Sequence, residues 1–213
     1  MRLYTYFRSS AAYRVRIALN LKGLDCEQVP VHLVRDGGEH LQAAYRQLNP
    51  EALLPTLVDG DAVLSQSLAI IEYLDETRPG PALLPGDALQ RARIRALSQA
   101  IACEIHALDN LRVLKYLQHT LGVDEAGRNA WYRHWITLGF GALEQRLAAE
   151  ASGRYCVGDS PSMADCCLVP QVFNARRFAV DLTPFPRIVA LDAQCQTLEA
   201  FVRAAPAQQS DAQ

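Results

Sequence analysis

The stretch spanning residues 4–21 constrains the fold more than any other part of the chain, because it joins a strand directly to a helix through two serines. Residues 3–7 are rich in aromatic and β-forming side chains, which predicts a strand. Ser9 and Ser10 carry hydroxyls that can cap a helix, and apolar residues then recur at helical spacing as far as Gly23. Helix starts hold anions through their free N–H groups and the helix dipole. The stretch therefore predicts an anion site, which would activate a thiol if the anion is a thiolate.

The first 80 residues alternate between short β-rich runs and helical segments. After the first strand and helix, the pattern predicts strands at residues 26–32, 56–58 and 62–64, and helices at residues 41–48 and 66–77. Asp59, Gly60 and Asp61 separate the last two strands and indicate a hairpin. The resulting order, β-α-β-α-β-β-α, predicts an α/β thioredoxin-like fold.

Proline and glycine are concentrated in residues 78–86, which indicates a linker, and beyond it the apolar spacing is almost entirely helical. We therefore expect a thioredoxin-like domain at residues 1–80, a linker at residues 81–87 and an all-α domain at residues 88–213. The predicted helices of the second domain span residues 89–121, residues 124–150 with a break near Gly139 and Gly141, residues 162–178 after a capping box at Ser162 and Asp165, and residues 187–205. The polar tail, residues 208–213, is expected to be disordered.

Composition excludes several classes of function. The formal net charge of −2 gives no basic field for nucleic acid. The apolar runs are too short to cross a bilayer, and the chain opens on a strand rather than on a signal peptide. The 6 cysteines lack C-x-x-C spacing and the 5 histidines lack metal-ligand spacing, which indicates buried reduced thiols and no metal site. These features predict a soluble cytoplasmic protein that binds neither nucleic acid nor membrane.

Several motifs follow one another along nearly the whole chain in the order typical of one known family. The motifs are R-S-S-x-x-x-R-V-R-I-A-L-x-L-K-G at residues 8–23, L-N-P at 48–50, Q-S-L-A-I-I-E-Y-L at 66–74, E-T-R-P at 76–79, Y-C-V-G-D at 155–159, M-A-D-C-C-L-V-P-Q-V at 163–172 and R-F-A-V-D-L-T-P-F-P at 177–186. The chain resembles the zeta-class glutathione transferases, which are maleylacetoacetate isomerases, and their close relatives the glutathione-dependent maleylpyruvate isomerases. The resemblance implies glutathione transferase architecture, glutathione as cofactor and a cytosolic homodimer.

Ser9 and Ser10 would do no more than cap a helix if the pattern were taken alone. The resemblance implies that the pair lies beside the glutathione sulfur, where serine acts as a hydrogen-bond donor to the thiolate. Lowering a thiol pKa by about two requires roughly 2.7 kcal/mol. A helix N-terminus contributes about 0.5–2 kcal/mol and a hydrogen bond to a charged acceptor about 1.5–3 kcal/mol, so together they suffice. We expect Ser9 to contact the sulfur and Ser10 to support it, although the order could be reversed.

Two further segments could bind the rest of glutathione. Taken alone, Pro55 indicates an edge strand and Ser67 an ordinary N-cap. The resemblance implies instead that the bond from Leu54 to Pro55 is cis, and that the N–H and C=O of Leu54 pair with the cysteinyl part of glutathione. It also implies that Gln66 and Ser67 bind the γ-glutamyl carboxylate at a helix start.

Arginines are the candidates for the substrate. Surface arginines are usually solvated, but a planar guanidinium can bind a carboxylate through two hydrogen bonds. The resemblance implies a small dicarboxylate substrate, and we expect Arg8 and Arg176 to bind its two carboxylates. Arg177 would replace Arg176 if the phase of the helix differs from the predicted one.

A polar group is predicted on the first helix of the second domain, where His106, Asp109 and Asn110 would share one face. Without the resemblance, these residues would form a buried polar cluster. The resemblance implies that Asn110 or its neighbour Asp109 touches glutathione or substrate, partly from the facing subunit. We treat His106 as a substrate contact.

The implied activity is a cis–trans isomerisation in the breakdown of aromatic compounds. The thiolate would add to the double bond of maleylacetoacetate or maleylpyruvate, the bond would rotate, and elimination would return glutathione with the fumaryl product. Two alternatives remain: a transferase that acts on α-haloacids or other electrophiles, and a non-catalytic glutathione-binding protein. Many family members carry a cysteine where this chain has Ala11, so redox chemistry by a cysteine there is excluded.

Overall fold

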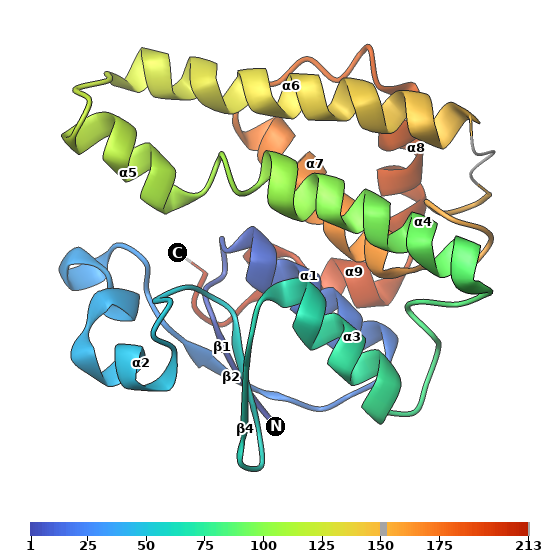
Figure 1. The fold of residues 1–213 in the computed structure, drawn as a ribbon, viewed down its shortest axis with the longest axis horizontal. Coiled ribbons are helices and arrows are strands. Elements are labelled where there is room, and N and C mark those ends of the chain that lie inside the picture. The colour runs from blue at the N-terminus through green and yellow to red at the C-terminus, as the bar shows by residue number, and fades with distance from the viewer. Residues whose placement is uncertain (150–152, 213) are drawn as a thin grey trace. The chain divides into compact units, whose positions relative to one another are not determined.

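The computed structural model describes residues 1–149 and 153–212 (Figure 1). The chain forms two compact units, of which the first comprises Met1–Leu84 and Gln196–Gln213 and the second Pro85–Cys195. The C-terminal segment, which the sequence pattern assigned to the helical domain, thus groups with the first unit because its helix packs on the first helix of the chain. No helix in the described part of the chain is long and apolar enough to cross a membrane.

The first unit contains a four-stranded sheet in the order β2-β1-β3-β4. Its strands are β1 (Arg2–Thr5), β2 (Glu27–Pro30), β3 (Thr56–Asp59) and β4 (Ala62–Ser65). Its helices are α1 (Ser10–Leu21), α2 (Ala43–Leu48), α3 (Ser67–Thr77) and α9 (Glu199–Ala204). Strand β1 pairs in parallel with β2 and antiparallel with β3, and β3 pairs antiparallel with β4. The predicted thioredoxin-like fold is confirmed.

The hairpin signal in the sequence produces the structure that it predicts, whereas the first strand differs from its predicted length. The turn from Asp59 to Ala62 joins β3 and β4 as a hairpin, with Gly60 in the left-handed region at φ 59°. Strand β1 is shorter than predicted, so Tyr6 and Phe7 belong to the connection between β1 and α1. Helix α1 packs against both α3 and α9 and is buried along most of its length.

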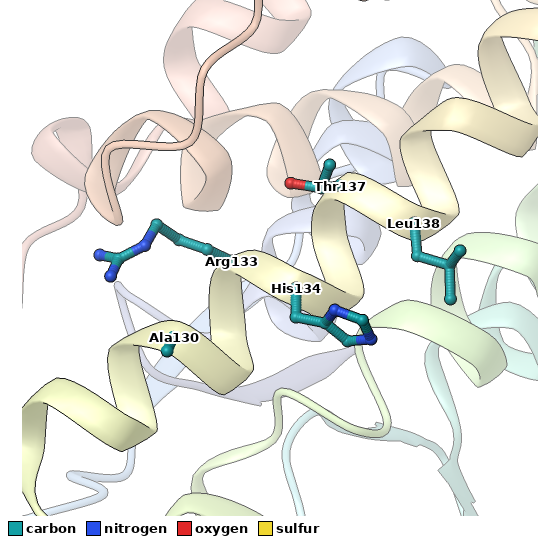
Figure 2. Close-up of a pocket in the computed structure, with 5 residues that line it drawn as sticks. All are labelled: Ala130, Arg133, His134, Thr137 and Leu138. Atoms are coloured by element: carbon teal, nitrogen blue, oxygen red, sulfur yellow. The ribbon is translucent and has the colours of Figure 1, made fainter.

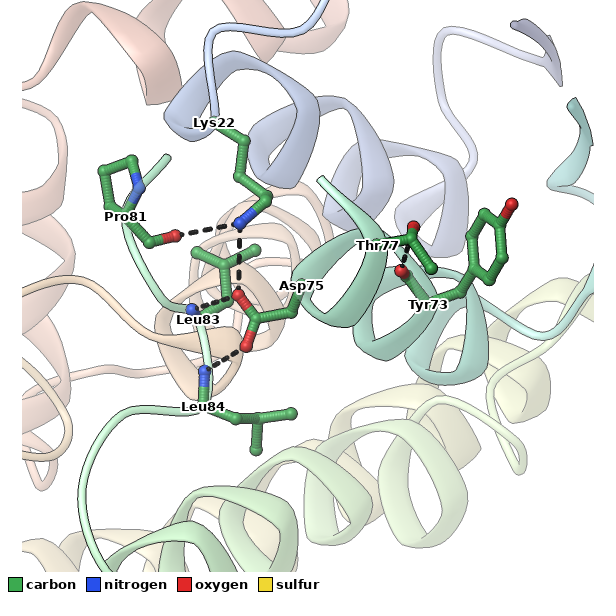
Figure 3. Close-up of polar contacts among 7 residues, drawn as sticks. All are labelled: Lys22, Tyr73, Asp75, Thr77, Pro81, Leu83 and Leu84. Carbon is green, nitrogen blue, oxygen red and sulfur yellow. Dashed lines mark hydrogen bonds and ion pairs between the residues drawn. The ribbon is translucent and has the colours of Figure 1, made fainter. Parts of the chain in front are cut away.

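A partly buried carboxylate joins α3 to the segment that follows it (Figure 3). Asp75, on α3, accepts hydrogen bonds from Leu83 N at 2.7 Å and Leu84 N at 3.0 Å. Its Oδ1 also lies 3.2 Å from Nζ of Lys22, a buried ammonium that donates to the carbonyl of Pro81 at 3.1 Å. The start of the predicted linker is therefore fastened to α1 and α3 through one charged side chain.

The second unit is helical in all its regular structure within the described residues. Its elements are α4 (Ala88–Gln99), a π-helical turn (Ala100–Ile105), α5 (Leu111–His119), α6 (Glu125–Ala149), α7 (Met163–Arg177) and α8 (Pro186–Cys195). The predicted capping box is confirmed: Ser162 N and Oγ each donate to Oδ2 of Asp165 at 2.8 Å, at the start of α7. Burial of this carboxyl raises its pKa.

The prediction of one helix over residues 89–121 is wrong. The π-helical turn follows α4, and residues 106–110 then leave the helix before α5 begins. Asn110 adopts an extended backbone and its Oδ1 accepts a hydrogen bond from Arg112 N at 3.1 Å, which caps α5. A side chain that satisfies the first free N–H groups of a new helix favours a break at that point.

The predicted break near Gly139 and Gly141 is also wrong, because α6 runs without interruption through both positions. A Cβ atom at Gly139 would lie 2.3 Å from Cδ1 of Ile105, so this glycine allows a close approach between elements rather than ending a helix. Glu150, at the end of the predicted helix, lies outside the described residues.

The C-terminal predictions need two corrections. The helix predicted over residues 187–205 is two helices, α8 and α9, because the chain passes from the second unit to the first after Cys195. The tail that was expected to be disordered is ordered through residue 212, because it contains a 3₁₀ turn at Pro206–Gln208 and a carboxylate, Asp211, that bonds to Phe7 N. Gln213 lies outside the described residues.

The cysteines differ from one another in burial. All six are free thiols, of which Cys156, Cys166, Cys167 and Cys195 are buried. Cys26 is partly buried, and Cys103 is exposed on the π-helical turn, so the expectation that all six are buried is wrong for these two.

We expect Asp75→Ala to lower the free energy of unfolding by about 3–5 kcal/mol, because it leaves two backbone N–H groups without their acceptor and a buried ammonium without its counter-ion. Chemical denaturation measures the change, with Asp61→Ala in the exposed hairpin turn as the matched control. A loss no larger than that of the control would contradict this role for Asp75.

Candidate functional site

Three chain segments, two that leave the sheet and one that enters it, meet at one end of the strands. Tyr4 pairs with Thr56, and Thr56 pairs with Ser65, and these pairs lie at the ends of their ladders. Because the neighbouring strands are antiparallel, the exit from β1, the entry to β3 and the exit from β4 meet at the same edge. That edge therefore carries the three predicted contact segments of the first unit: Ser9 with Ser10, Leu54 with Pro55, and Gln66 with Ser67.

Ser9 caps α1 with a partly exposed hydroxyl. Its backbone is extended (φ −70°, ψ 112°) and its Oγ accepts a hydrogen bond from Ala12 N at 3.2 Å. A hydroxyl that accepts in this way keeps its own O–H for a further partner. Ser10 is the first residue of α1 and is buried. The geometry therefore favours Ser9 over Ser10 as the donor to an anion at the helix start.

The bond from Leu54 to Pro55 is cis, as predicted. Pro55 enters β3, which lies between β1 and β4, so the interpretation of this proline as part of an edge strand is wrong. Leu53, the residue before Leu54, is held by its carbonyl, which accepts from the Tyr45 hydroxyl at 2.7 Å and from Asn49 Nδ2 at 3.0 Å.

Ser67 is not the N-cap of α3 but its first residue, and Gln66 occupies the N-cap position. Gln66 has a φ of 67°, a conformation uncommon for a residue with a side chain, and its Nε2 donates to Oε2 of Glu51 at 2.9 Å. The Ser67 hydroxyl accepts a hydrogen bond from Nη1 of Arg14 at 3.2 Å. Arg14 and Ser67 are both buried, so a guanidinium lies directly behind the start of α3.

Arg14 is a candidate site residue that the sequence pattern did not single out. Its cationic group adds to the positive end of the α3 dipole, and both favour an anion bound at Ser67. The signal was present in the sequence, because Arg14 and Arg16 interrupt a mostly apolar helix. A charged residue at such a position is buried only where acceptors are available.

The candidate arginines have different surroundings. Arg8 is exposed, with its guanidinium 4.8 Å from the centre of the Phe7 ring. In the second unit, Nη1 of Arg176 lies 2.6 Å from Oδ2 of the buried Asp192. Arg177 instead lies 5.3 Å from the centre of the Phe178 ring. Their binding of substrate carboxylates stays a prediction.

His106, Asp109 and Asn110 do not share one face of a helix, because the chain leaves the helix between Ile105 and α5. Asp109 is 3% exposed, and both of its carboxyl oxygens lack a hydrogen-bond partner within the described residues. Burial raises its pKa to about 8. At neutral pH this carboxyl is thus mostly protonated and can donate a hydrogen bond.

A hollow on α6 offers a weaker candidate site (Figure 2). Its lining consists of Ala130, Arg133, His134, Thr137 and Leu138. All five are exposed side chains of a single helix, whereas small-molecule sites are concave and converge on the ligand from several elements. None of the predicted site residues lies in this hollow. In the described part of the chain, no group of three or more His, Cys, Asp or Glu side chains is placed to hold a metal ion.

Comparison with known proteins gives consistent matches. Residues 3–82 match the family described as glutathione S-transferase, N-terminal domain. The chain is 54% identical to a maleylpyruvate isomerase of Ralstonia over 212 residues, which cover 99% of each chain. It is similar, with a TM-score of 0.97, 54% identity and complete coverage of both chains, to the holo structure of a bacterial zeta-class maleylpyruvate isomerase. A maleylacetoacetate isomerase of Methylobacterium extorquens with bound malonate and glutathione matches with a TM-score of 0.96, 39% identity and complete coverage of both chains.

The buried Asp109 makes stability depend on pH. Its folded pKa of about 8 lies above the ordinary value of 3.8, so the folded chain holds a proton that the unfolded chain has lost. This stabilisation is fully present below the unfolded value and is lost as pH rises through the folded one. We expect the free energy of unfolding to fall by at most about 1.4 kcal/mol per pH unit between these values.

Asp109→Asn should remove this contribution, because an amide does not titrate in this range. Denaturation series at several pH values, run on the original chain and on the variant, measure the difference in slope. Equal slopes would show that Asp109 titrates normally.

Proposed function

This chain belongs to the zeta-class glutathione transferases, the family of maleylacetoacetate and maleylpyruvate isomerases, and we propose that it is a glutathione-dependent cis–trans isomerase of a maleyl dicarboxylate. The main structural support for the proposal is the arrangement of two helix starts beside one strand. The starts of α1 and α3, each with a serine hydroxyl, lie at the same edge of the sheet as the entry to β3. That arrangement offers two anion sites and a length of backbone between them.

These elements fit the groups of glutathione. We assign the γ-glutamyl carboxylate to Gln66 and Ser67, where the α3 dipole and the buried Arg14 favour a negative charge. We assign the cysteinyl backbone to Leu54 and the sulfur to Ser9, with Ser10 in support. Bound glutathione supplies a thiolate that adds reversibly to the substrate double bond, so that the bond can rotate before the thiol is released.

The contribution of the chain is to stabilise the thiolate and orient the substrate. The O–H of Ser9 donates to the sulfur, and the positive end of α1 favours its negative charge. Arg8 and Arg176 bind the two carboxylates of the substrate, with Arg177 as the alternative to Arg176. Fixing both carboxylates orients the double bond between them and lowers the entropic cost of reaction.

The remaining assignments concern the second unit and the assembly. We propose that Asp109 and Asn110 contact glutathione and that His106 contacts substrate. We further propose a cytoplasmic homodimer that acts on small dicarboxylates and binds neither nucleic acid nor membrane. We propose maleylacetoacetate and maleylpyruvate as alternative substrates, because similar proteins are named as isomerases of one or the other.

The test is to follow the disappearance of maleylpyruvate and of maleylacetoacetate by absorbance, each with and without glutathione. We expect loss that depends on glutathione, formation of the fumaryl product and no net consumption of thiol. The faster substrate would then define the activity. If neither substrate reacts while chloroacids or other electrophiles consume thiol, the chain is a conjugating transferase and the proposal is overturned.

Replacing Ser9 by Ala should reduce kcat/KM by about 10- to 150-fold, because it removes a hydrogen bond to a charged acceptor. The acid limb of the pH–rate profile should move to higher pH, since a less stabilised thiolate forms only at higher pH. Ser10→Ala, one residue away and buried, is the matched control and should have the smaller effect. The reverse ranking would assign the sulfur to Ser10.

A further inference from the structure

The C-terminal end of the chain reaches the connection between β1 and α1, close to the serine pair in sequence (Figure 1). Oδ2 of Asp211 accepts a hydrogen bond from the backbone N–H of Phe7 at 3.0 Å. Both residues belong to the first unit. A bond from an N–H group to an ionised carboxylate is among the stronger hydrogen bonds in proteins.

A buried arginine holds the same connection from its other side. Arg16, on α1, is 3% exposed, and its Nη2 donates to the carbonyl of Phe7 at 3.1 Å. Its Nη1 lies within hydrogen-bond distance of Thr5 Oγ1 and of the Tyr6 carbonyl, at 3.0 and 3.3 Å. The backbone of Phe7 therefore donates its N–H to the charged side chain of Asp211 and accepts at its C=O from that of Arg16.

The guanidinium of Arg16 and the carboxylate of Asp211 also interact electrostatically. Burial lowers the pKa of Arg16 to about 10, and electrostatic interactions with Tyr13 and then with Asp211 oppose that change. Nε of Arg16 donates to the carbonyl of Ala204 at 3.1 Å, at the end of α9. The C-terminal segment thus supplies a backbone acceptor to the guanidinium that fixes the connection, and the charge of Asp211 acts on that guanidinium electrostatically.

The position of Ser9 depends on this connection. Ser9 N donates to the carbonyl of Tyr6 at 2.9 Å, so the turn that presents the Ser9 hydroxyl starts from the segment held by Arg16 and Asp211. The tail itself is held in place, because Gln209 Nε2 donates to the carbonyls of Arg203 and Ala205 at 2.9 and 3.0 Å. Removing the Asp211 carboxylate would release the N–H of Phe7, two residues before Ser9.

We propose that Asp211 is a positioning residue for the thiolate site, and that the C-terminal segment acts as a strap that sets the geometry of the turn carrying Arg8, Ser9 and Ser10. This inference rests on the proposed function, because it assigns the strap to the same site. It adds a residue far away in sequence, on a segment outside all the motifs by which the family resemblance was found.

The experiment compares Asp211→Ala and Asp211→Asn in the full-length chain, with Asp61→Ala in the exposed hairpin turn as control. We expect Asp211→Ala to lower kcat/KM about tenfold and to raise the pKa of bound glutathione, followed by the ultraviolet absorbance of its thiolate. Asp211→Asn keeps an oxygen acceptor for Phe7 N and should restore much of the loss. The control should match the original chain in both measurements.

Thermal unfolding separates positioning from stability alone. If Asp211→Ala lowers the melting temperature but leaves the pKa of bound glutathione and the pH–rate profile unchanged well below that temperature, the proposal is wrong. The pKa of bound glutathione needs no maleyl substrate. A raised value in Asp211→Ala would therefore support the strap even if the isomerase assays fail, whereas failure of those assays alone would overturn only the proposed function.

Discussion

Two charged side chains on a buried helix organise the first unit. Helix α1 is covered by α3 on one side and by α9 on another, yet it carries Arg14 and Arg16 among its buried residues. Burying a guanidinium without hydrogen-bond acceptors is energetically costly, so the surrounding segments must supply such acceptors. Arg14 reaches the start of α3, and Arg16 reaches the β1–α1 connection and the end of α9. The segments that form the site are therefore fixed by the requirements of the core.

The helix starts and the buried Arg14 explain why the candidate site can favour negative charge. The starts of α1 and α3 provide N–H groups and the positive ends of two helix dipoles at one edge of the sheet. Arg14 adds a buried positive charge behind the second of these starts. Serine hydroxyls complete both positions, and because each of them already accepts a hydrogen bond, their O–H groups are available as donors. No side chain that acts as a base is needed to stabilise a thiolate under these conditions.

Three carboxyl groups, of which Asp75 is partly buried and Asp109 and Asp165 are buried, differ in their hydrogen-bond partners. Asp75 accepts bonds from two backbone N–H groups and an ammonium, and Asp165 accepts from the N–H and hydroxyl of Ser162, the N-cap of α7, and from Cys156 N. Asp109 has no such partners within the described residues, and its pKa is raised by burial. A buried acid without partners is costly and is more often found where a ligand will supply the missing bonds. This contrast, rather than its place in a motif, makes Asp109 a candidate for glutathione contact.

The sequence by itself determined the features that depend on neighbouring residues. The hairpin at Gly60, the capping box at Ser162 and the helix start at Ser9 each follow from local backbone and side-chain chemistry. The thioredoxin-like fold of the first unit followed from the order of its strands and helices, and the cis peptide bond at Pro55 followed from the family resemblance. Both are present in the structure.

Only the tertiary structure decided the features that depend on distant partners. Gly139 stays within a continuous helix because Ile105 packs against it, although its local propensity indicates a break. The chain leaves the helix before Asn110, and the tail around Asp211 is ordered by a bond to Phe7. Hydrogen bonds that join residues far apart in sequence leave no periodic pattern in it. For that reason the bonding partners of Arg14 and Asp211 became visible only in the folded chain.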